Sequence, residues 1–204
     1  MSAWFRTPLG ILACPPRGGY TSLDSCLIVD QRGGRKFGQL ESLHTQVTLI
    51  SRDPWQRWLS GVYWFRTHQV SDIVVAAIPA DVITEFKTRP ITSSYFRDFS
   101  YHITRPLEMY GQGNPYVETD QHYTSASRYL QDCGFDKPDS VIRLEHTQCY
   151  LQQFSIDYKT ENVVDRYQGT TKQAFAQQAR DTYGIMQKLW EDDFRWRKQA
   201  VGRI

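Results

Sequence analysis

Two cations, each at a junction between a predicted strand and a predicted helix, are the residues of this sequence with the clearest chemical use. Arg52 directly follows the apolar stretch 46–51, and the next residues, Asp53 and Pro54, are typical of a helix cap and a first helical position. Arg17 precedes a glycine pair in the segment PPRGGYTSL. A guanidinium beside the backbone N–H groups of a helix start is a site for an oxyanion such as phosphate. The two junctions therefore predict two anion-binding points.

The segment that begins at Arg17 would bind mainly through its backbone. Glycines let the chain approach an oxyanion closely, and the N–H groups and hydroxyls that follow can point toward it. The expected anion-binding residues of the segment are Arg17, Gly18, Gly19, Tyr20, Thr21 and Ser22. It is not the loop of nucleotide triphosphatases, because G-x-x-x-x-G-K-[ST] is absent. By itself, a glycine pair is equally typical of an ordinary strand-to-helix turn.

The second junction continues into a helix with one polar face. Asp53, Arg57 and Ser60 fall at i, i+4 and i+7 and therefore share that face. The alternative to an anion site is a surface Arg52 with an aspartate cap and a local ion pair between Asp53 and Arg57.

Taken together, the two segments resemble the cofactor motifs of the sulfotransferase superfamily, which uses 3'-phosphoadenosine 5'-phosphosulfate (PAPS). PRGGYTSL is similar to the family loop P-[KR]-x-G-[ST]-T-S-L, and RDPWQRWLS is similar to R-[DN]-P-x-x-R-x-x-S. DQHYTSASRYL, SVIRLEHTQ and the Asp-Phe of LWEDDF resemble segments of the carbohydrate-type members. The matching pieces follow the order of the family and frame most of the chain.

The resemblance implies a role for each matched residue. Arg17 would contact the bridging and leaving oxygens, and the turn after it would hold the 5'-phosphosulfate. Arg52 and Ser60 would bind the 3'-phosphate, whereas Arg57 would support the helix and a neighbouring loop. The sequence departs from the family in two ways: Tyr20 stands where Ser or Thr is usual, and the two motifs lie closer together than is expected for the family.

Sulfuryl transfer would proceed in line, with charge stabilisation by cations and without a metal, so a base for the acceptor proton is the remaining requirement. Asp30 and His44 are the candidate catalytic bases, with Glu41 beside them; His44 has the more suitable ordinary pKa, and Asp30 follows the first predicted helix. An exposed polar side chain is the alternative for each. His122 is the candidate acceptor-binding residue, with a structural histidine as its alternative. Glu145 is expected to anchor a loop or to face the cleft, and the structural role is favoured.

The composition excludes several classes of protein. The chain of 204 residues is 40% hydrophobic and 23% charged with a net charge of +2, which argues against disorder and against bulk attraction to nucleic acid. The four cysteines have no C-x-x-C spacing, so no zinc site is expected. No signal peptide and no apolar run of transmembrane length is recognised. We expect a soluble cytoplasmic protein whose acceptor is a small molecule or a glycan, with no nucleic-acid or membrane partner.

The elements that would position these residues alternate along the chain. Strands are expected at 10–14, 46–51 and 140–145, and helices at about 21–29, 37–44, 54–67, 80–89, 121–132 and 171–199, the last with a possible break at Gly184. Residues 72–78 fit either a strand or a helix. Residues 90–120 are rich in Tyr, Pro, Gly and Thr and predict an irregular region on the acceptor side. The alternation favours an α/β fold: one three-layer domain over 1–204 with a mainly parallel sheet flanked by helices, as in the P-loop-like sulfotransferase fold.

Two other functions fit the same residues. A non-catalytic sulfotransferase-like domain would bind the product 3'-phosphoadenosine 5'-phosphate (PAP), an anionic glycan or a protein partner. A nucleotide-dependent kinase would use a similar scaffold, but the missing Walker lysine and the lack of an obvious magnesium carboxylate count against it.

Overall fold

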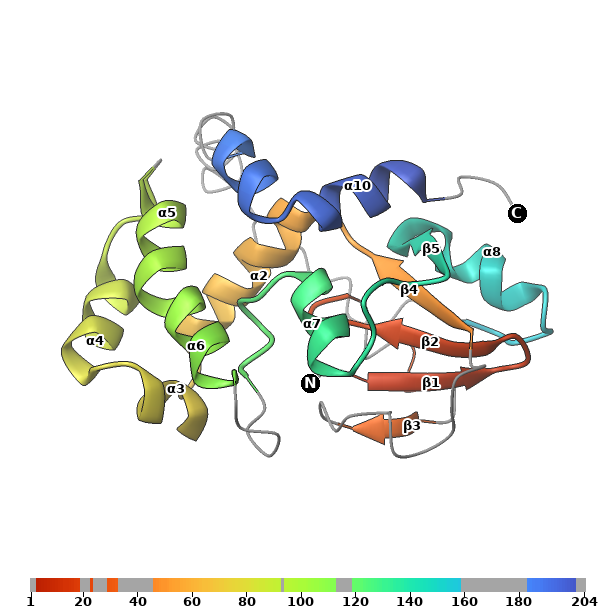
Figure 1. Ribbon diagram of the computed structural model, residues 1–204, viewed down its shortest axis with the longest axis horizontal. Helices are drawn as coiled ribbons and strands as arrows, with labels where there is room; N and C mark the ends of the chain where they lie inside the picture. The colour runs from red at the N-terminus through yellow and green to blue at the C-terminus, as the bar shows by residue number, and fades with distance from the viewer. Residues whose placement is uncertain are drawn as a thin grey trace.

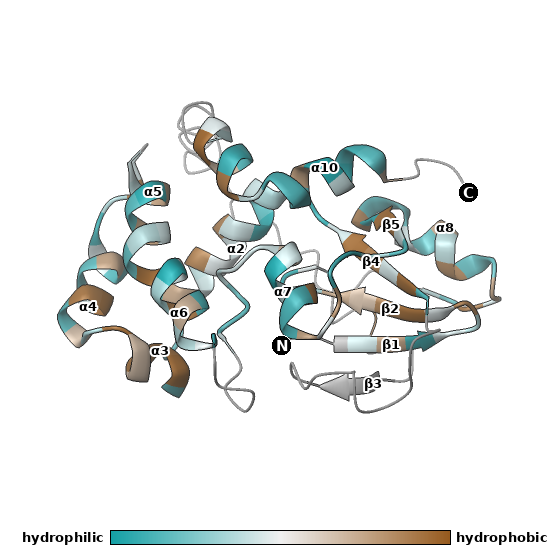
Figure 2. Cartoon of the chain, viewed as in Figure 1, coloured by the Kyte–Doolittle hydropathy of each residue, from teal (hydrophilic) through white to brown (hydrophobic). Residues whose placement is uncertain are grey.

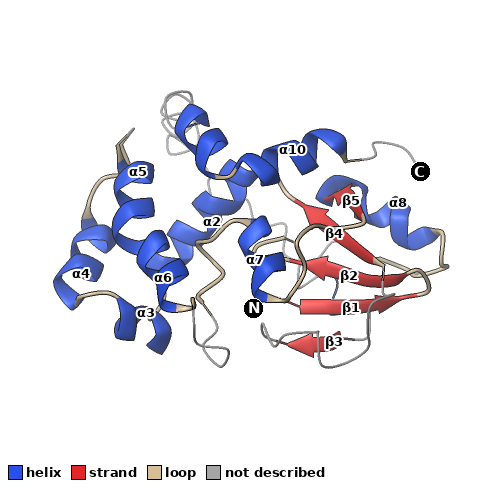
Figure 3. Ribbon diagram, viewed as in Figure 1, coloured by secondary structure: helices blue, strands red, loops and turns tan. Residues whose placement is uncertain are grey.

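A mixed sheet forms one half of the molecule, and a group of helices forms the other half (Figures 1 and 3). The computed structural model describes residues 3–18, 23, 29–32, 46–92, 94–112, 119–158 and 183–200. Its five strands follow the order β3-β1-β2-β4-β5. Within the described ranges, no helix has both the length and the apolar character needed to cross a membrane.

The three strands predicted from the sequence are the parallel part of the sheet. β2 (Gly10–Cys14), β4 (Val47–Ser51) and β5 (Ser140–Arg143) pair in that order and run in one direction. β4 is buried along its whole length, as expected for a strand covered on both faces. The carboxyl ends of the three strands meet at one edge, and open α/β sheets bind their ligands at this edge.

Two strands that the sequence analysis missed extend the sheet in antiparallel fashion, so the sheet is mixed. β1 (Ala3–Thr7) forms a hairpin with β2, and β3 (Val29–Arg32) pairs with the other side of β1. Gly10 closes the hairpin with a φ of 128°, and a Cβ there would lie 2.3 Å from the carbonyl oxygen of Gln46. Glycine is therefore required where the hairpin meets the start of β4.

Helices cover both faces of the sheet, which confirms the α/β class. α7 (Ala126–Asp132) and α10 (Glu191–Gln199) pack on one face, where Tyr129 and Trp196 join the apolar residues of β2 and β4. α8 (Thr147–Gln152) packs on the other face through residues that include Leu151. The sheet is the middle layer (Figure 1).

After β4 the chain forms a group of helices, here called the helical lobe, which has a hydrophobic core of its own. It consists of α2 (Pro54–Thr67), α3 (Asp72–Ala77), α4 (Ala80–Thr88), α5 (Tyr95–Phe99), the π-helix η2 (Ser100–Thr104) and α6 (Arg105–Tyr110). Trp58 and Phe65 of α2 lie in the centre of this core. Figure 2 shows hydrophobic residues along α3 and α4 as well, at the end of the lobe away from the sheet.

Residues 95–110 are a continuous helical run, so the prediction of an irregular region at 90–120 is wrong for this part. Four fully buried residues recur at every fourth position, Tyr95, Phe99, Ile103 and Leu107, and Phe96 and Thr104 are buried beside them. An ideal helix of 3.6 residues per turn would rotate such positions off one face. The wider π-turn, in which the N–H of Arg105 donates to the carbonyl of Ser100, offsets this drift.

The other element predictions have mixed outcomes. The helix at 54–67 is confirmed with its bounds, the helix at 80–89 is confirmed within one residue, and 72–77 is helical. Val29 belongs to β3 rather than to a helix, α7 begins at Ala126, and β5 gives way to the short helix η3 (Leu144–His146). The C-terminal helix breaks at Trp190, whereas Gly184 lies within the helical residues 183–189. The predicted helix at 37–44 lies outside the described residues.

Candidate anion-binding site

The start of α2 has the capping geometry that the sequence predicted. Asp53 is the N-cap, its Oδ1 accepts the N–H of Gln56 at 2.9 Å, and Pro54 occupies the first turn. The hydroxyl of Tyr183 donates to the second carboxylate oxygen of Asp53 at 3.2 Å. Both oxygens of the cap are thus held, and the first turn of α2 is fixed directly after the end of β4.

The turn after β2 holds Arg17 in an uncommon backbone conformation. The N–H of Gly18 donates to the carbonyl of Pro15 at 2.9 Å, and Arg17 has a φ of 65°. Turns that need a positive φ at this position usually contain glycine, and another residue costs roughly 1–2 kcal/mol. A Cβ on Gly18 would lie 2.8 Å from the oxygen of Pro15, so a side chain is not tolerated there. Such strain is concentrated at functional sites in many proteins.

The side chain of Arg52 meets the backbone of Arg17 at the carboxyl edge of the sheet. β2 and β4 are parallel neighbours, and Nη1 of Arg52 donates to the carbonyl oxygen of Arg17 at 3.0 Å. Arg52 lies directly before the N-terminus of α2, and the guanidinium of Arg17 lies further along the same helix, over Trp64. The positive charge and the helix N-terminus at this edge suit an anion.

Comparisons of the chain with family models, curated proteins and solved structures gave no match. The positions of the predicted site residues therefore come from the structure alone. Ser60 is half-buried on α2, two turns after Arg52. Gly19, Tyr20, Thr21 and Ser22 lie outside the described residues.

Of the candidate bases, the described residues include only Asp30, and it does not lie at this edge of the sheet. Asp30 lies in β3, at an outer edge of the sheet and separated from β2 by β1. It falls at an irregularity in the pairing, since Gln31 pairs with Trp4 but Val29 pairs with Phe5. His44 and Glu41 lie outside the described residues.

Arg57 supports the helix and a loop, as the resemblance implied. Its buried side chain donates to the carbonyl of Thr124 at 2.5 Å and pairs with Asp193 of α10 at 3.4 Å. Asp193 also accepts the N–H groups of Ala126 and Ser127, at 2.7 and 2.9 Å. The ion pair thus joins α2, α7 and α10, which corrects the alternative of a local pair with the aspartate cap of α2.

The loop 119–125 lies against α2 and brings His122 next to the arginine site. A Cβ on Gly61 would be 2.2 Å from the carbonyl oxygen of His122, so the two backbones are in direct contact. The rings of Trp64 and His122 stack with centroids 5.9 Å apart and an interplanar angle of 7°. The guanidinium carbon of Arg17 lies 4.2 Å from the centroid of the same Trp64 ring. No local pattern predicted that Trp64 would lie between Arg17 and His122, because this depends on contacts between distant segments.

His122 is paired with a buried carboxylate. Oδ1 of Asp120 accepts both Nδ1–H and the backbone N–H of His122, at 2.7 and 3.1 Å. Burial lowers the pKa of His122, although Asp120 partly opposes this effect, and the charge of Arg17 lowers it further. Burial opposes ionisation of Asp120, but its hydrogen bonds with His122 and the hydroxyl of Ser71 outweigh this and hold its pKa below the ordinary value. We therefore assign an ionised Asp120 and a neutral His122 at pH 7.

Glu145 anchors a helix to the same edge of the sheet. Its Oε1 accepts Nη2–H of Arg197 at 2.6 Å, while Nη1–H of Arg197 donates to the carbonyl of Ser51 at 2.9 Å. Arg197 of α10 therefore bridges the ends of β4 and β5. Glu145 has the favoured structural role, although it anchors a helix rather than a loop.

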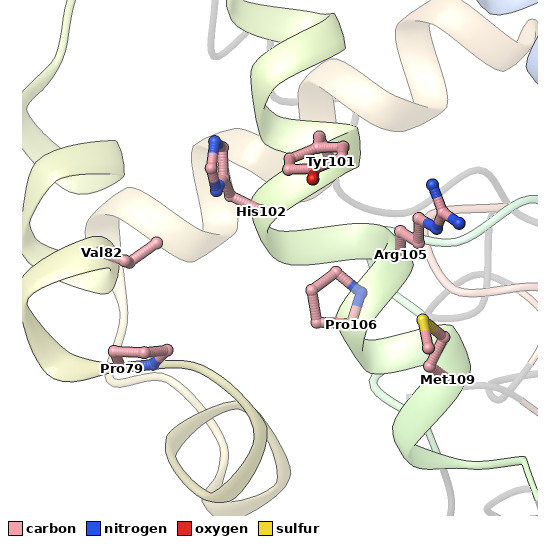
Figure 4. A pocket seen from close by; sticks show the side chains of 7 residues that line it. All are labelled: Pro79, Val82, Tyr101, His102, Arg105, Pro106 and Met109. Carbon is pink, nitrogen blue, oxygen red and sulfur yellow. The ribbon is translucent and has the colours of Figure 1, made fainter.

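An open groove of about 450 Å³ lies elsewhere, between α4 and the segment η2–α6 of the helical lobe (Figure 4). Its walls are formed by Pro79, Val82, Tyr101, His102, Arg105, Pro106 and Met109. Tyr101 and Arg105 belong to the expected acceptor region 90–120, whereas Tyr95 and Phe96 from the same region are buried in the core of the helical lobe. In the part of the chain that the structure describes, no cluster of three His, Cys, Asp or Glu residues suits a metal ion.

Proposed function

We propose that this protein is a sulfotransferase that moves a sulfuryl group from PAPS to a hydroxyl acceptor, with a carbohydrate as the favoured acceptor class. The observation that carries the proposal is the hydrogen bond from Arg52 to the carbonyl of Arg17 across the ends of two parallel strands. It joins two segments that, in sequence, resemble the two phosphate-binding motifs of one cofactor. A doubly phosphorylated nucleotide needs two such cationic points on one edge.

In this proposal each residue has a simple electrostatic task. Arg52, with the hydroxyl of Ser60 on α2, binds the 3'-phosphate, and the N-terminus of α2 adds its positive dipole. Arg17 neutralises the charge that develops on the leaving 5'-phosphate as the sulfuryl group departs. Its guanidinium is held over the ring of Trp64 before the substrate binds, so little reorganisation is needed during the reaction. Arg57 holds α2 and the loop 119–125 in place through Asp193 and Thr124.

The test is titration calorimetry with PAP. Arg52→Ala should weaken binding by about 10- to 100-fold, the effect of losing a charge-assisted hydrogen bond to phosphate. Arg97→Ala is the matched control, because it removes the same charge from an exposed position on α5 and should leave the affinity unchanged. Absence of PAP binding by the wild-type protein, or an equal loss in both variants, would refute the site.

Two further arms separate the alternative functions. Stronger binding of ATP with magnesium than of PAP would favour a kinase. Binding of PAP that depends on Arg52, but without sulfuryl transfer from PAPS to any of a panel of glycans and small hydroxyl compounds, would favour a non-catalytic binding domain.

A further inference from the structure

The pair of Asp120 and His122 has the arrangement of a positioned base. The side chain of Asp120 is only 7% exposed, and it accepts hydrogen bonds from Nδ1–H and the backbone N–H of His122 and from the hydroxyl of Ser71. Because a carboxylate can only accept, Nδ1 of His122 carries the proton and Nε2 carries the lone pair. The side chain of His122 remains 20% exposed. A buried acid thus fixes both the tautomer and the direction of a ring that solvent still reaches.

This pair is linked to Arg17 through the ring of Trp64. Trp64 contacts both residues through its ring, with Arg17 at 4.2 Å and His122 at 5.9 Å from the ring centroid. The loop 119–125 that carries the pair is held against α2, since Gly61 contacts the carbonyl of His122 and Arg57 donates to the carbonyl of Thr124.

We propose that His122 is the general base that takes the proton of the acceptor hydroxyl, with Asp120 as its positioning residue. The inference rests on the sulfuryl transfer proposed above. The acceptor oxygen forms a bond to the sulfur of PAPS while its proton passes to Nε2 of His122. The bond between sulfur and the 5'-phosphate oxygen breaks, and its electron pair leaves on PAP. The imidazolium, stabilised by Asp120, then returns the proton to water.

The surroundings of His122 suit this task. Burial and the positive charge of Arg17 lower its pKa, so the ring is neutral and able to accept a proton at pH 7. The neighbouring Tyr123 has a pKa raised by burial, and His68 stacks on Trp64, the same ring that lies beside His122. Among the candidate bases, Asp30 is less well placed, because it lies in β3 at an outer edge of the sheet.

The test compares His122→Gln and Asp120→Asn with His68→Gln, a control that removes another histidine from the same tryptophan. His122→Gln should bind PAP within about threefold of wild type but lose about 100- to 10,000-fold in kcat, together with the acidic limb of the pH–rate profile. Asp120→Asn should lose less in kcat and should shift the acidic limb to another pH, whereas His68→Gln should keep the wild-type kcat and pH–rate profile. Imidazole added to His122→Ala should restore part of the activity. Unchanged kcat and pH profile in His122→Gln would overturn the inference.

A second measurement does not depend on turnover. In the wild-type protein, nuclear magnetic resonance should show that PAP raises the pKa of His122, because the nucleotide brings negative charge near the ring. Binding of PAP without any effect on this pKa would overturn the role of His122 and leave the nucleotide site intact. Failure of PAP to bind at all would instead overturn the proposed function and this inference with it.

Discussion

Gly61 is the position at which the smallest change should have the largest structural effect. In Gly61→Ala the new Cβ would lie 2.2 Å from the carbonyl oxygen of His122 and 3.2 Å from its carbonyl carbon. Both atoms belong to the backbone, so no change of rotamer relieves the overlap. We expect the loop 119–125 to move away from α2 as a unit.

The cost has two parts. Forcing an extra methyl group into a closely packed contact costs about 1–3 kcal/mol. Displacing the carbonyl of Thr124 from the buried guanidinium of Arg57 removes a charge-assisted hydrogen bond, which contributes roughly 1.5–3 kcal/mol. Because neighbouring effects are not fully additive, we expect the free energy of unfolding to fall by about 3–5 kcal/mol in total.

Urea unfolding of the two proteins measures this difference, with Gly184→Ala as the control. Gly184 is exposed within the helical residues 183–189, and a Cβ there would meet no atom within 4 Å. Alanine is the better helix former, so Gly184→Ala should gain about 0.5–1 kcal/mol. A Gly61→Ala protein as stable as wild type would refute the direct contact between α2 and the loop.

Two further predictions concern buried charge. Asp193→Ala should lower the free energy of unfolding by about 3–5 kcal/mol, because it leaves Arg57 buried without its acid and two N–H groups of α7 without an acceptor. Asp193→Asn keeps one acceptor oxygen and should lower the free energy of unfolding by less. Equal losses of the two variants in urea unfolding would contradict the capping role of Asp193. Burial lowers the pKa of His122, so the folded state binds fewer protons than the unfolded state below the ordinary histidine pKa of about 6.5. The free energy of unfolding should therefore fall as the pH drops through this value, and His122→Gln should remove that part of the slope; an identical slope in the variant would show that His122 is not shifted.

The sequence patterns correctly predicted those elements whose start or burial is determined by a few neighbouring residues. The start of α2 follows from a capping aspartate and a proline, and both act within one turn. β2, β4 and β5 were recognised as short apolar runs. β1 was missed although Trp4 and Phe5 are fully buried in it, because its strand character comes from pairing with β2 and β3.

The helical run 95–110 contained a signal that composition concealed. Its tyrosines, prolines and threonines suggested a loop, but the spacing of four between Tyr95, Phe99, Ile103 and Leu107 marks a single buried face. A π-turn is needed to keep that spacing on one side, and patterns based on 3.6 residues per turn do not anticipate it.

The site was predictable only in part for the same reason. Arg17 and Arg52 were found because each belongs to a local motif, and the parallel pairing of their strands explains why they meet. The partners of Arg57 and His122 depend on contacts between segments far apart in the chain. Asp193 lies 136 positions after Arg57, and no local pattern links the two.

The order of Arg57, Ala126 and Asp193 along the chain also bears on synthesis. Until this residue has left the ribosome, a nascent chain holds Arg57 without its counter-charge and α7 without the acceptor for its first N–H groups. The helical lobe can collapse earlier around its own apolar residues, and the sheet can do so without Trp196, since a growing chain folds from its N-terminal side. The contacts of Asp193 that join α2, α7 and α10 therefore form only after these earlier steps. A chain terminated before residue 193 would have most of its hydrophobic residues but would lack these contacts.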